Sequence, residues 1–317
     1  MTDTQNEVFK SLVNKIRLFE HGAPGSQNLK LTRKYYTEDM PDGRVKHIVQ
    51  NITDPDIVPY IPDGIGNSTD RQRIPAVLII PGGAFRRLVY NFEGEDVAKW
   101  LNSMGIAAFV LECRLPSDEH DNAEDVPLID AMRAMRVIRG RAQEFGIDEA
   151  KIGVMGFSAG GFMAALLSTA YESDVYADYK YKDEYDKLSA RPDFAVCSYP
   201  VISIDDCIEA GKRYMSEEQV LERISDSKAK ILHKYNPDKL VRPDMPPVFI
   251  CETDDDRTTL SENSVGFYMA ARKAGVSAEL HIFRTGGHGY GCGDDFAQTG
   301  EWKVLFTKWI KSIGIIS

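Results

Sequence analysis

The stretch KIGVMGFSAGGFMAALL, residues 151–167, decides the fold, because an apolar run, a turn centred on Ser158 and an Ala- and Leu-rich run follow one another directly. This order predicts a buried strand that delivers Ser158 to a sharp turn before a helix. Glycines flank the turn because its backbone is strained, and a neighbouring Cβ would crowd the strand or the helix. The helix N-terminus then points at any anion that forms beside the hydroxyl, so Ser158 is the candidate nucleophile.

A second apolar run leads into a glycine turn earlier in the chain. AVLII at 76–80 is followed by PGGAF at 81–85, which is typical of a buried parallel strand that ends in a loop of bare backbone. Loops of this type supply an N–H group opposite the one that follows the nucleophile. The candidate oxyanion-hole donors are therefore the amides of Ala159 and of Gly83 or Ala84. The alternative is that the glycines only permit a tight turn.

A candidate base stands in the last third of the chain. Of the six histidines, His288 alone lies on a glycine-rich loop, GGHGYG at 286–291, just after a predicted strand. An imidazole in that position can reach the serine. His120 lies in a charged segment and is expected in a solvated turn, whereas His233 falls in a polar helical segment. His288 is therefore the candidate general base.

The candidate acid comes from the strand before the histidine loop. PVFIC at 247–251 predicts a buried strand that runs into ETDDD at 252–256. The resulting order of serine, aspartate and histidine is that of the α/β-hydrolases. Spacing alone does not separate Asp254, Asp255 and Asp256.

These motifs together resemble the acetyl-xylan-esterase-like (carbohydrate esterase, BD-FAE-like) branch of the α/β-hydrolases. The resemblance covers roughly residues 45–315 and rests on residues 146–161, PGGAF, YPVIS at 199–203, PPVFICETDDD at 246–256 and ELHIFRTGGHGYG at 279–291. The acid motif of the branch, approximately H-T-A-D-D, places the acid at Asp255. The branch has Gly-Gly-Gly-Tyr where this chain has GGAF at 82–85. We therefore expect Ala84 to keep its N–H but to narrow the acyl side of the site with its β-carbon.

The resemblance implies a serine hydrolase that cleaves small-acyl esters, acetyl first, of a carbohydrate or similar alcohol. Ser158, His288 and Asp255 would form the triad, with an acyl-enzyme intermediate and no metal or organic cofactor. A general short-chain carboxylesterase or lipase-like enzyme is the first alternative. A serine peptidase of the prolyl-oligopeptidase type has similar motifs, but the roughly 75 residues before the sheet are too few for its β-propeller. A non-enzymatic binding module is disfavoured because all three triad positions are occupied.

The motifs also predict the architecture. They run from Pro81 to His288, so we expect a single α/β-hydrolase domain over residues 1–317. Residues 1–40 form a polar lead-in with a helix at 7–20, and strands at 44–51 and 56–60 start the sheet in antiparallel fashion. Alternating strands and helices then predict a mostly parallel sheet with helices on both faces. The charged segment 205–240 is longer than an ordinary connection and predicts a helical insertion that caps the site, or else a helical pair packed away from it.

Composition narrows the range of partners and surroundings. A formal charge of −10 argues against nucleic acid and anionic membranes and is compatible with a small neutral ester. We find no run of 18 apolar residues and no basic, then apolar, start, so neither a membrane-spanning helix nor a signal peptide is expected. The five cysteines are dispersed without a C-x-x-C pair, which favours the cytoplasm. The oligomeric state is not indicated.

Overall fold

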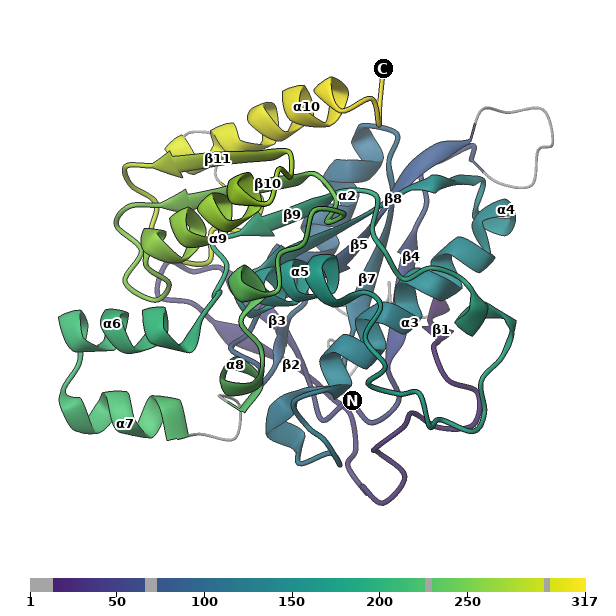
Figure 1. The fold of residues 1–317 in the computed structure, drawn as a ribbon, viewed down its shortest axis with the longest axis horizontal. Coiled ribbons are helices and arrows are strands. Elements are labelled where there is room, and N and C mark those ends of the chain that lie inside the picture. Colours follow the sequence, from purple (N-terminus) through teal and green to yellow (C-terminus); the bar gives the residue numbers. More distant parts are fainter. Residues whose placement is uncertain (1–13, 66–72, 226–229, 294–296) are drawn as a thin grey trace.

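One mixed sheet organises the computed structural model, which describes residues 14–65, 73–225, 230–293 and 297–317 (Figure 1). Its eight strands among these residues lie in the order β1-β4-β7-β5-β8-β9-β10-β11. The pairs β1–β4 and β4–β7 are antiparallel, and all pairs from β7 to β11 are parallel. The predicted α/β fold with a mostly parallel sheet is therefore confirmed. The strands are β1 (Ile16–Arg17), β4 (Asp56–Tyr60), β5 (Ile74–Ile80), β7 (Ala107–Glu112), β8 (Ile147–Phe157), β9 (Ala195–Ser198), β10 (Val248–Thr253) and β11 (Ala278–Phe283).

The central strands are buried on both faces. Every residue of β7, β9 and β10 is buried, and since successive side chains of a strand point to opposite faces, both faces of the sheet must be covered. The covering helices are α2 (Asp96–Ser103), α3 (Val126–Gly140), α4 (Ala142–Phe145), α5 (Ala159–Ala170), α9 (Ser261–Lys273) and α10 (Trp302–Ser312). Trp100 of α2 packs against Trp302 of α10, with 4.9 Å between ring centroids.

A second, three-stranded sheet lies beside the first and corrects one prediction. It consists of β2 (Lys34–Asp39), β3 (Val45–Gln50) and β6 (Leu88–Val89). The strand predicted at 44–51 is β3, which does not join the main sheet, because it pairs with β2 and with the chain just after the PGGAF turn, Ile48 lying opposite Val89. The antiparallel start of the main sheet is instead β4 together with β1.

The lead-in belongs partly to the core. Residues 7–13 of the helix predicted at 7–20 lie outside the described residues, and Ile16–Arg17 is the edge strand β1 rather than helix. Leu18 and Phe19 follow it and are buried. The apolar residues that the predicted helix would have carried therefore enter the core from an extended segment.

The insertion predicted at 205–240 is helical. It contains α6 (Ile204–Tyr214), α7 (Glu217–Ser225) and α8 (Lys230–Lys234), and α6 and α7 project together from one side of the molecule (Figure 1). A β-carbon on Gly211 would lie 2.6 Å from the side chain of Val220, so the two helices pack closely there. The guanidinium carbon of Arg257 lies over the ring of Tyr214, 5.5 Å from the ring centroid, which places the end of α6 beside the loop after β10. That the insertion covers the site remains a prediction.

Short helical turns complete the described chain. They are the π-turn η2 (Asn91–Glu95) and the 3₁₀ turns η3 (Pro116–Asp118), η4 (Glu184–Lys187), η6 (Pro237–Lys239) and η7 (Gln298–Glu301). None of the helices in the described part of the chain is both long and apolar enough to cross a bilayer. The three cysteines in apolar strand regions, Cys113, Cys197 and Cys251, are buried and free.

Candidate active site

Ser158 occupies the strained turn that the sequence predicts. It lies between β8 and α5 with φ 54° and ψ −119°, a backbone conformation that is costly for a residue with a side chain. A β-carbon on Gly156 would lie 1.9 Å from the carbonyl oxygen of Gly160, and one on Gly160 would lie 1.9 Å from that of Ile80. Both flanking glycines are therefore required by close backbone approach.

His288 reaches the serine from the loop after β11. Its Nε2 lies 2.8 Å from Ser158 Oγ, and its side chain is 22% exposed. Gly287 before it and Gly289 after it both have positive φ, which lets the loop turn tightly on either side of the imidazole. The predicted contact between His288 and Ser158 is present. His281, in contrast, bonds Glu279 at 2.7 Å within its own strand.

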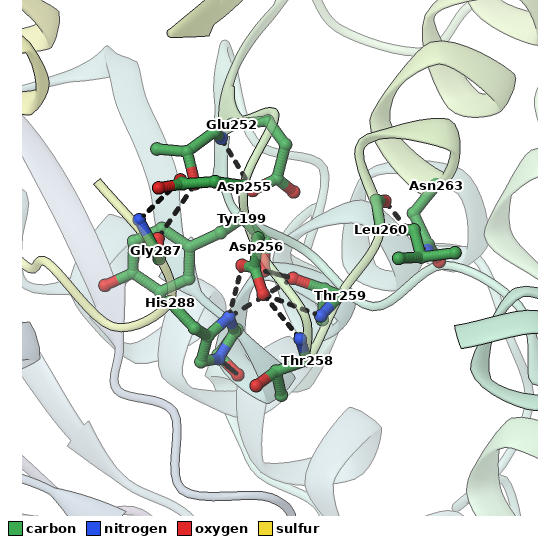
Figure 2. Close-up of polar contacts among 12 residues, drawn as sticks. Tyr199, Glu252, Asp255, Asp256, Thr258, Thr259, Leu260, Asn263, Gly287 and His288 are labelled. Carbon is green, nitrogen blue, oxygen red and sulfur yellow. Dashed lines mark hydrogen bonds and ion pairs between the residues drawn. The ribbon is translucent and has the colours of Figure 1, made fainter. Parts of the chain in front are cut away.

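The aspartate that contacts His288 is Asp256, and the prediction of Asp255 for that position is wrong. Asp256 Oδ2 lies 2.6 Å from His288 Nδ1 (Figure 2). Its other oxygen accepts the amides of Thr258 and Thr259 at 2.7 and 3.0 Å. The Asp256 carboxylate is buried, and both of its oxygens accept hydrogen bonds.

Asp255 has a different contact. It is exposed, and its Oδ1 accepts the Gly287 amide at 2.8 Å, so it holds the backbone of the histidine loop rather than the imidazole (Figure 2). The register is off by one because a turn follows β10: the Asp256 amide donates to the Thr253 carbonyl, at 3.4 Å. That turn directs the third aspartate inward and leaves the second at the surface.

Hydrogen bonds outweigh burial in the electrostatics of Asp256. Burial by itself raises its pKa, but the hydrogen bond and charge of His288 and the amides of Thr259 and Thr258 favour the ionised form, and the net pKa is lowered. The hydroxyl of Thr259 also lies 2.9 Å from Asp256 Oδ2. Asp256 is therefore an anion at neutral pH, which suits a group that orients and stabilises an imidazolium.

The PGGAF turn packs directly against the serine. Its Gly82 approaches the nucleophile so closely that a β-carbon there would lie 2.9 Å from Ser158 Cβ. The Gly82 amide is already bonded to Glu93, at 2.8 Å. Gly83, Ala84 and Phe85 follow with φ of 136°, 56° and 58°, an unusual run for a loop that contains two non-glycine residues. The strain indicates that the surrounding contacts hold this loop in one conformation.

The third candidate donor, Ala159, is the first residue of α5. The N–H groups of a helix's first turn have no acceptor within the helix and carry its positive dipole end. Ala159 thus lies directly after Ser158, in the first turn of this helix. That the amides of Ala159 and of Gly83 or Ala84 form the oxyanion hole remains a prediction.

A small cavity lies beside Ala159, the residue after the serine. Its volume is about 10 Å³, and its walls include Gly82, Phe85, Ala159, Leu115 and Met163. Such a volume holds about one water-sized group. Ala84 is exposed and does not line this cavity, and the expectation that its β-carbon narrows the acyl side of the site remains a prediction. The buried side chain of Phe85 lines it, and its ring packs edge-to-face against that of Phe162, with 5.6 Å between ring centroids.

Sequence reasoning missed two buried polar residues of the site. Tyr199 follows β9, and its ring lies 5.1 Å from that of His288. Glu93, in η2, accepts the Tyr199 hydroxyl at 2.9 Å. Burial raises the pKa of Glu93, while the Tyr199 hydroxyl, the charge of His288 and the Gly82 amide oppose that rise. Tyr199 heads the YPVIS motif, but neither residue has a spacing that marks it.

Comparison with known proteins agrees with the fold. The chain is 31% identical over 240 residues to an acetylxylan esterase of Xylanibacter ruminicola, a match over 75% of this chain and 45% of that protein. It is also 31% identical over 227 residues to endo-1,4-beta-xylanase B of Butyrivibrio fibrisolvens, over 71% of this chain and 34% of the relative. The chain therefore spans less than half the length of these curated relatives.

Solved structures match over nearly the whole chain. The crystal structure of an acetyl ester-xyloside bifunctional hydrolase from Caldicellulosiruptor lactoaceticus has a TM-score of 0.70 and 34% identity, and the match covers 96% of this chain and 97% of that one. The carboxylesterase Cest-2923 of Lactobacillus plantarum, at TM-score 0.66 and 20% identity, covers 90% and 99% and supports the fold alone. The BD-FAE family model matches residues 65–270, which include Ser158, Gly83, Ala84 and Asp256. The chain belongs to the BD-FAE family of α/β-hydrolases.

Proposed function

We propose that this protein is a serine esterase that removes small acyl groups, acetyl first, from a carbohydrate or similar alcohol. The observation that carries the proposal is the continuous contact from Ser158 Oγ through His288 to Asp256, at 2.8 and 2.6 Å, on a strained strand-to-helix turn. A nucleophile, a base and a buried anion that orients the base are the parts that acyl transfer needs.

The geometry supports a two-step reaction. Ser158 Oγ attacks the ester carbonyl carbon while its proton passes to His288 Nε2, and Asp256 accepts the hydrogen bond from Nδ1–H. The amides of Ala159 and of Gly83 or Ala84 stabilise the oxyanion, and losing one such donor typically costs about 3 kcal/mol. The C–O bond then breaks, and the alcohol leaves with the proton from Nε2. Water, deprotonated by the same imidazole, releases the acid and restores the serine.

For the small-acyl preference, we assign the acyl group to the cavity that Ala159, the residue after the nucleophile, helps to line. A space of about 10 Å³ between Phe85 and Met163 accommodates a methyl-sized group and little more. The names of two relatives, an acetylxylan esterase and an acetyl ester-xyloside hydrolase, agree with acetyl and with a sugar as the alcohol. Because the chain covers only 45% of the first relative, this agreement supports the substrate class but does not identify the ester.

A general short-chain carboxylesterase is the second candidate. An esterase from Thermogutta terrifontis, with a propionate-bound structure, matches 93% of this chain at TM-score 0.65 and 25% identity. A somewhat larger acyl group is therefore compatible with the same fold. The size dependence of turnover distinguishes this enzyme from an acetylesterase.

The test combines a substrate panel with variants of the site. Acetate release is measured from acetylated xylo-oligosaccharides, acetylated monosaccharides and short-chain lipid esters, with an aminoacyl-proline anilide included to detect peptidase activity. Ser158→Ala and His288→Ala should each abolish hydrolysis while the protein remains folded, and the exposed His233→Ala should retain near wild-type turnover. Substantial activity in Ser158→Ala would remove the proposed nucleophile.

A further inference from the structure

Glu93 is a buried carboxyl group that the triad does not use. It is 5% exposed, and its two oxygens have separate partners: Oε2 accepts the Gly82 amide at 2.8 Å, and Oε1 accepts the Tyr199 hydroxyl at 2.9 Å. Among the described residues no lysine or arginine forms an ion pair with it. Burying an acid without a cationic partner is costly, so its retention here calls for a role.

Tyr199 extends this contact to the histidine loop. Its hydroxyl donates to Glu93 and also accepts the Gly291 amide at 2.9 Å. Its ring packs against those of His288 and Tyr290, at 5.1 and 4.5 Å between centroids (Figure 2 shows Tyr199 next to His288). The tyrosine itself has a positive φ of 37° and is fully buried, so its position is tightly determined.

The two contacts join the loops that carry the opposite halves of the chemistry. At one end of this series of hydrogen bonds is Gly82, directly before the proposed oxyanion donors Gly83 and Ala84. The other end is Gly291, three residues after His288. Because the Gly82 N–H donates to Glu93, it is not available to the substrate. The orientation of the next two amides, those of Gly83 and Ala84, depends on the position of Gly82.

We propose that Glu93 is a positioning residue that, through Tyr199, fixes the oxyanion loop relative to the histidine loop. The inference rests on the proposed function. Loss of the link should let the amides and the imidazole drift from the reacting carbonyl, and displacements of about 1 Å in such sites can cost about 100-fold in rate. Ground-state binding depends little on that alignment, so the loss should appear in kcat rather than in KM.

The test uses Glu93→Gln and Tyr199→Phe with 4-nitrophenyl acetate. Glu93→Gln keeps the shape of the side chain but replaces one acceptor oxygen by an N–H₂ group, which faces either the Gly82 amide or the Tyr199 hydroxyl. Tyr199→Phe keeps the ring against His288 and removes the hydroxyl. Rates are expressed per serine labelled by a fluorophosphonate taken to completion, so unfolded protein does not count. We expect kcat to fall by about 10- to 100-fold in each variant, with KM within about twofold of wild type.

A double variant and a matched control complete the design. If Glu93 and Tyr199 act as one link, the double variant should lose no more than the larger single loss, because linked residues are non-additive. Glu95→Gln changes a carboxyl group of the same π-turn, whose ion pair in the described part of the chain is with surface Lys99, at 2.8 Å, and this variant should leave kcat unchanged. The inference is overturned if Glu93→Gln or Tyr199→Phe retains kcat within twofold of wild type, or if their losses multiply. In that case an inactive Ser158→Ala would still uphold the proposed function.

Discussion

Replacement of Asp256 by asparagine should reduce turnover far more than the same change at Asp255. In the structure Asp256 Oδ2 faces His288 Nδ1 at 2.6 Å, while Oδ1 is occupied by the amides of Thr258 and Thr259. Asparagine can keep its carbonyl oxygen on those two amides only by turning its N–H₂ group toward Nδ1. The imidazole then carries its proton on Nε2, where it cannot take the proton of Ser158.

The magnitude follows from this exchange of tautomers. A wrong tautomer in such a triad lowers kcat by about 10⁴, equivalent to about 5 kcal/mol of transition-state stabilisation. Asp255→Asn retains an oxygen for the Gly287 amide and loses only an exposed charge. Its cost should stay below about tenfold, because an exposed hydrogen bond is at most weakened.

The assay is initial-rate hydrolysis of 4-nitrophenyl acetate at pH 7.5, with rates expressed per folded enzyme from thermal unfolding. The matched control is Asp254→Asn, because Asp254 is exposed and lies one position further from His288 in the sequence than Asp255 does. The reasoning is refuted if Asp255→Asn loses more activity than Asp256→Asn. It is also refuted if Asp256→Asn stays folded and retains more than about one tenth of wild-type turnover.

Two further expectations concern the acyl cavity and the acid limit of stability. With p-nitrophenyl esters, kcat/KM should fall from acetyl to butyryl to octanoyl. Met163→Ala, which enlarges the cavity of about 10 Å³, should raise kcat/KM for the butyryl ester relative to the acetyl ester. If kcat/KM of the wild type instead rises from acetyl to hexanoyl, where each accommodated methylene can add about 0.8 kcal/mol of binding, the general carboxylesterase is favoured. Burial and the charge of Arg114 lower the pKa of His120 to about 4, below the value of about 6.5 in the unfolded chain. Because the folded state resists protonation, the contribution of neutral His120 to folding stability is fully present above about pH 6.5 and is lost as the pH falls toward 4. In urea unfolding, the stability advantage of wild type over His120→Gln should therefore shrink by about 2 kcal/mol between pH 7.5 and pH 4.5, and an advantage independent of pH would contradict this.

The sequence by itself determined the parts of this site that depend on local backbone. The glycines around Ser158 and His288 are required within a few residues of where they stand, by a strained turn and by a tight loop. The buried strands before them are marked by continuous apolar runs. The order of the motifs then identified the fold, and sequence similarity supports the family.

Tertiary structure alone decided which side chains meet. Three consecutive aspartates look alike in the sequence, and only the turn from Thr253 to Asp256 determines that the third one faces His288. His120 shows the same limit: its charged neighbours predicted a solvated turn, yet it is 5% exposed and lies 3.0 Å from the Ser26 hydroxyl, contributed by a segment more than 90 residues away. Glu93 carries no signal of its own because its two partners, Gly82 and Tyr199, lie 11 and 106 residues away from it in the sequence. A side chain's direction at a turn and its long-range partners are set by packing of the whole chain, which a local pattern of residue types does not encode.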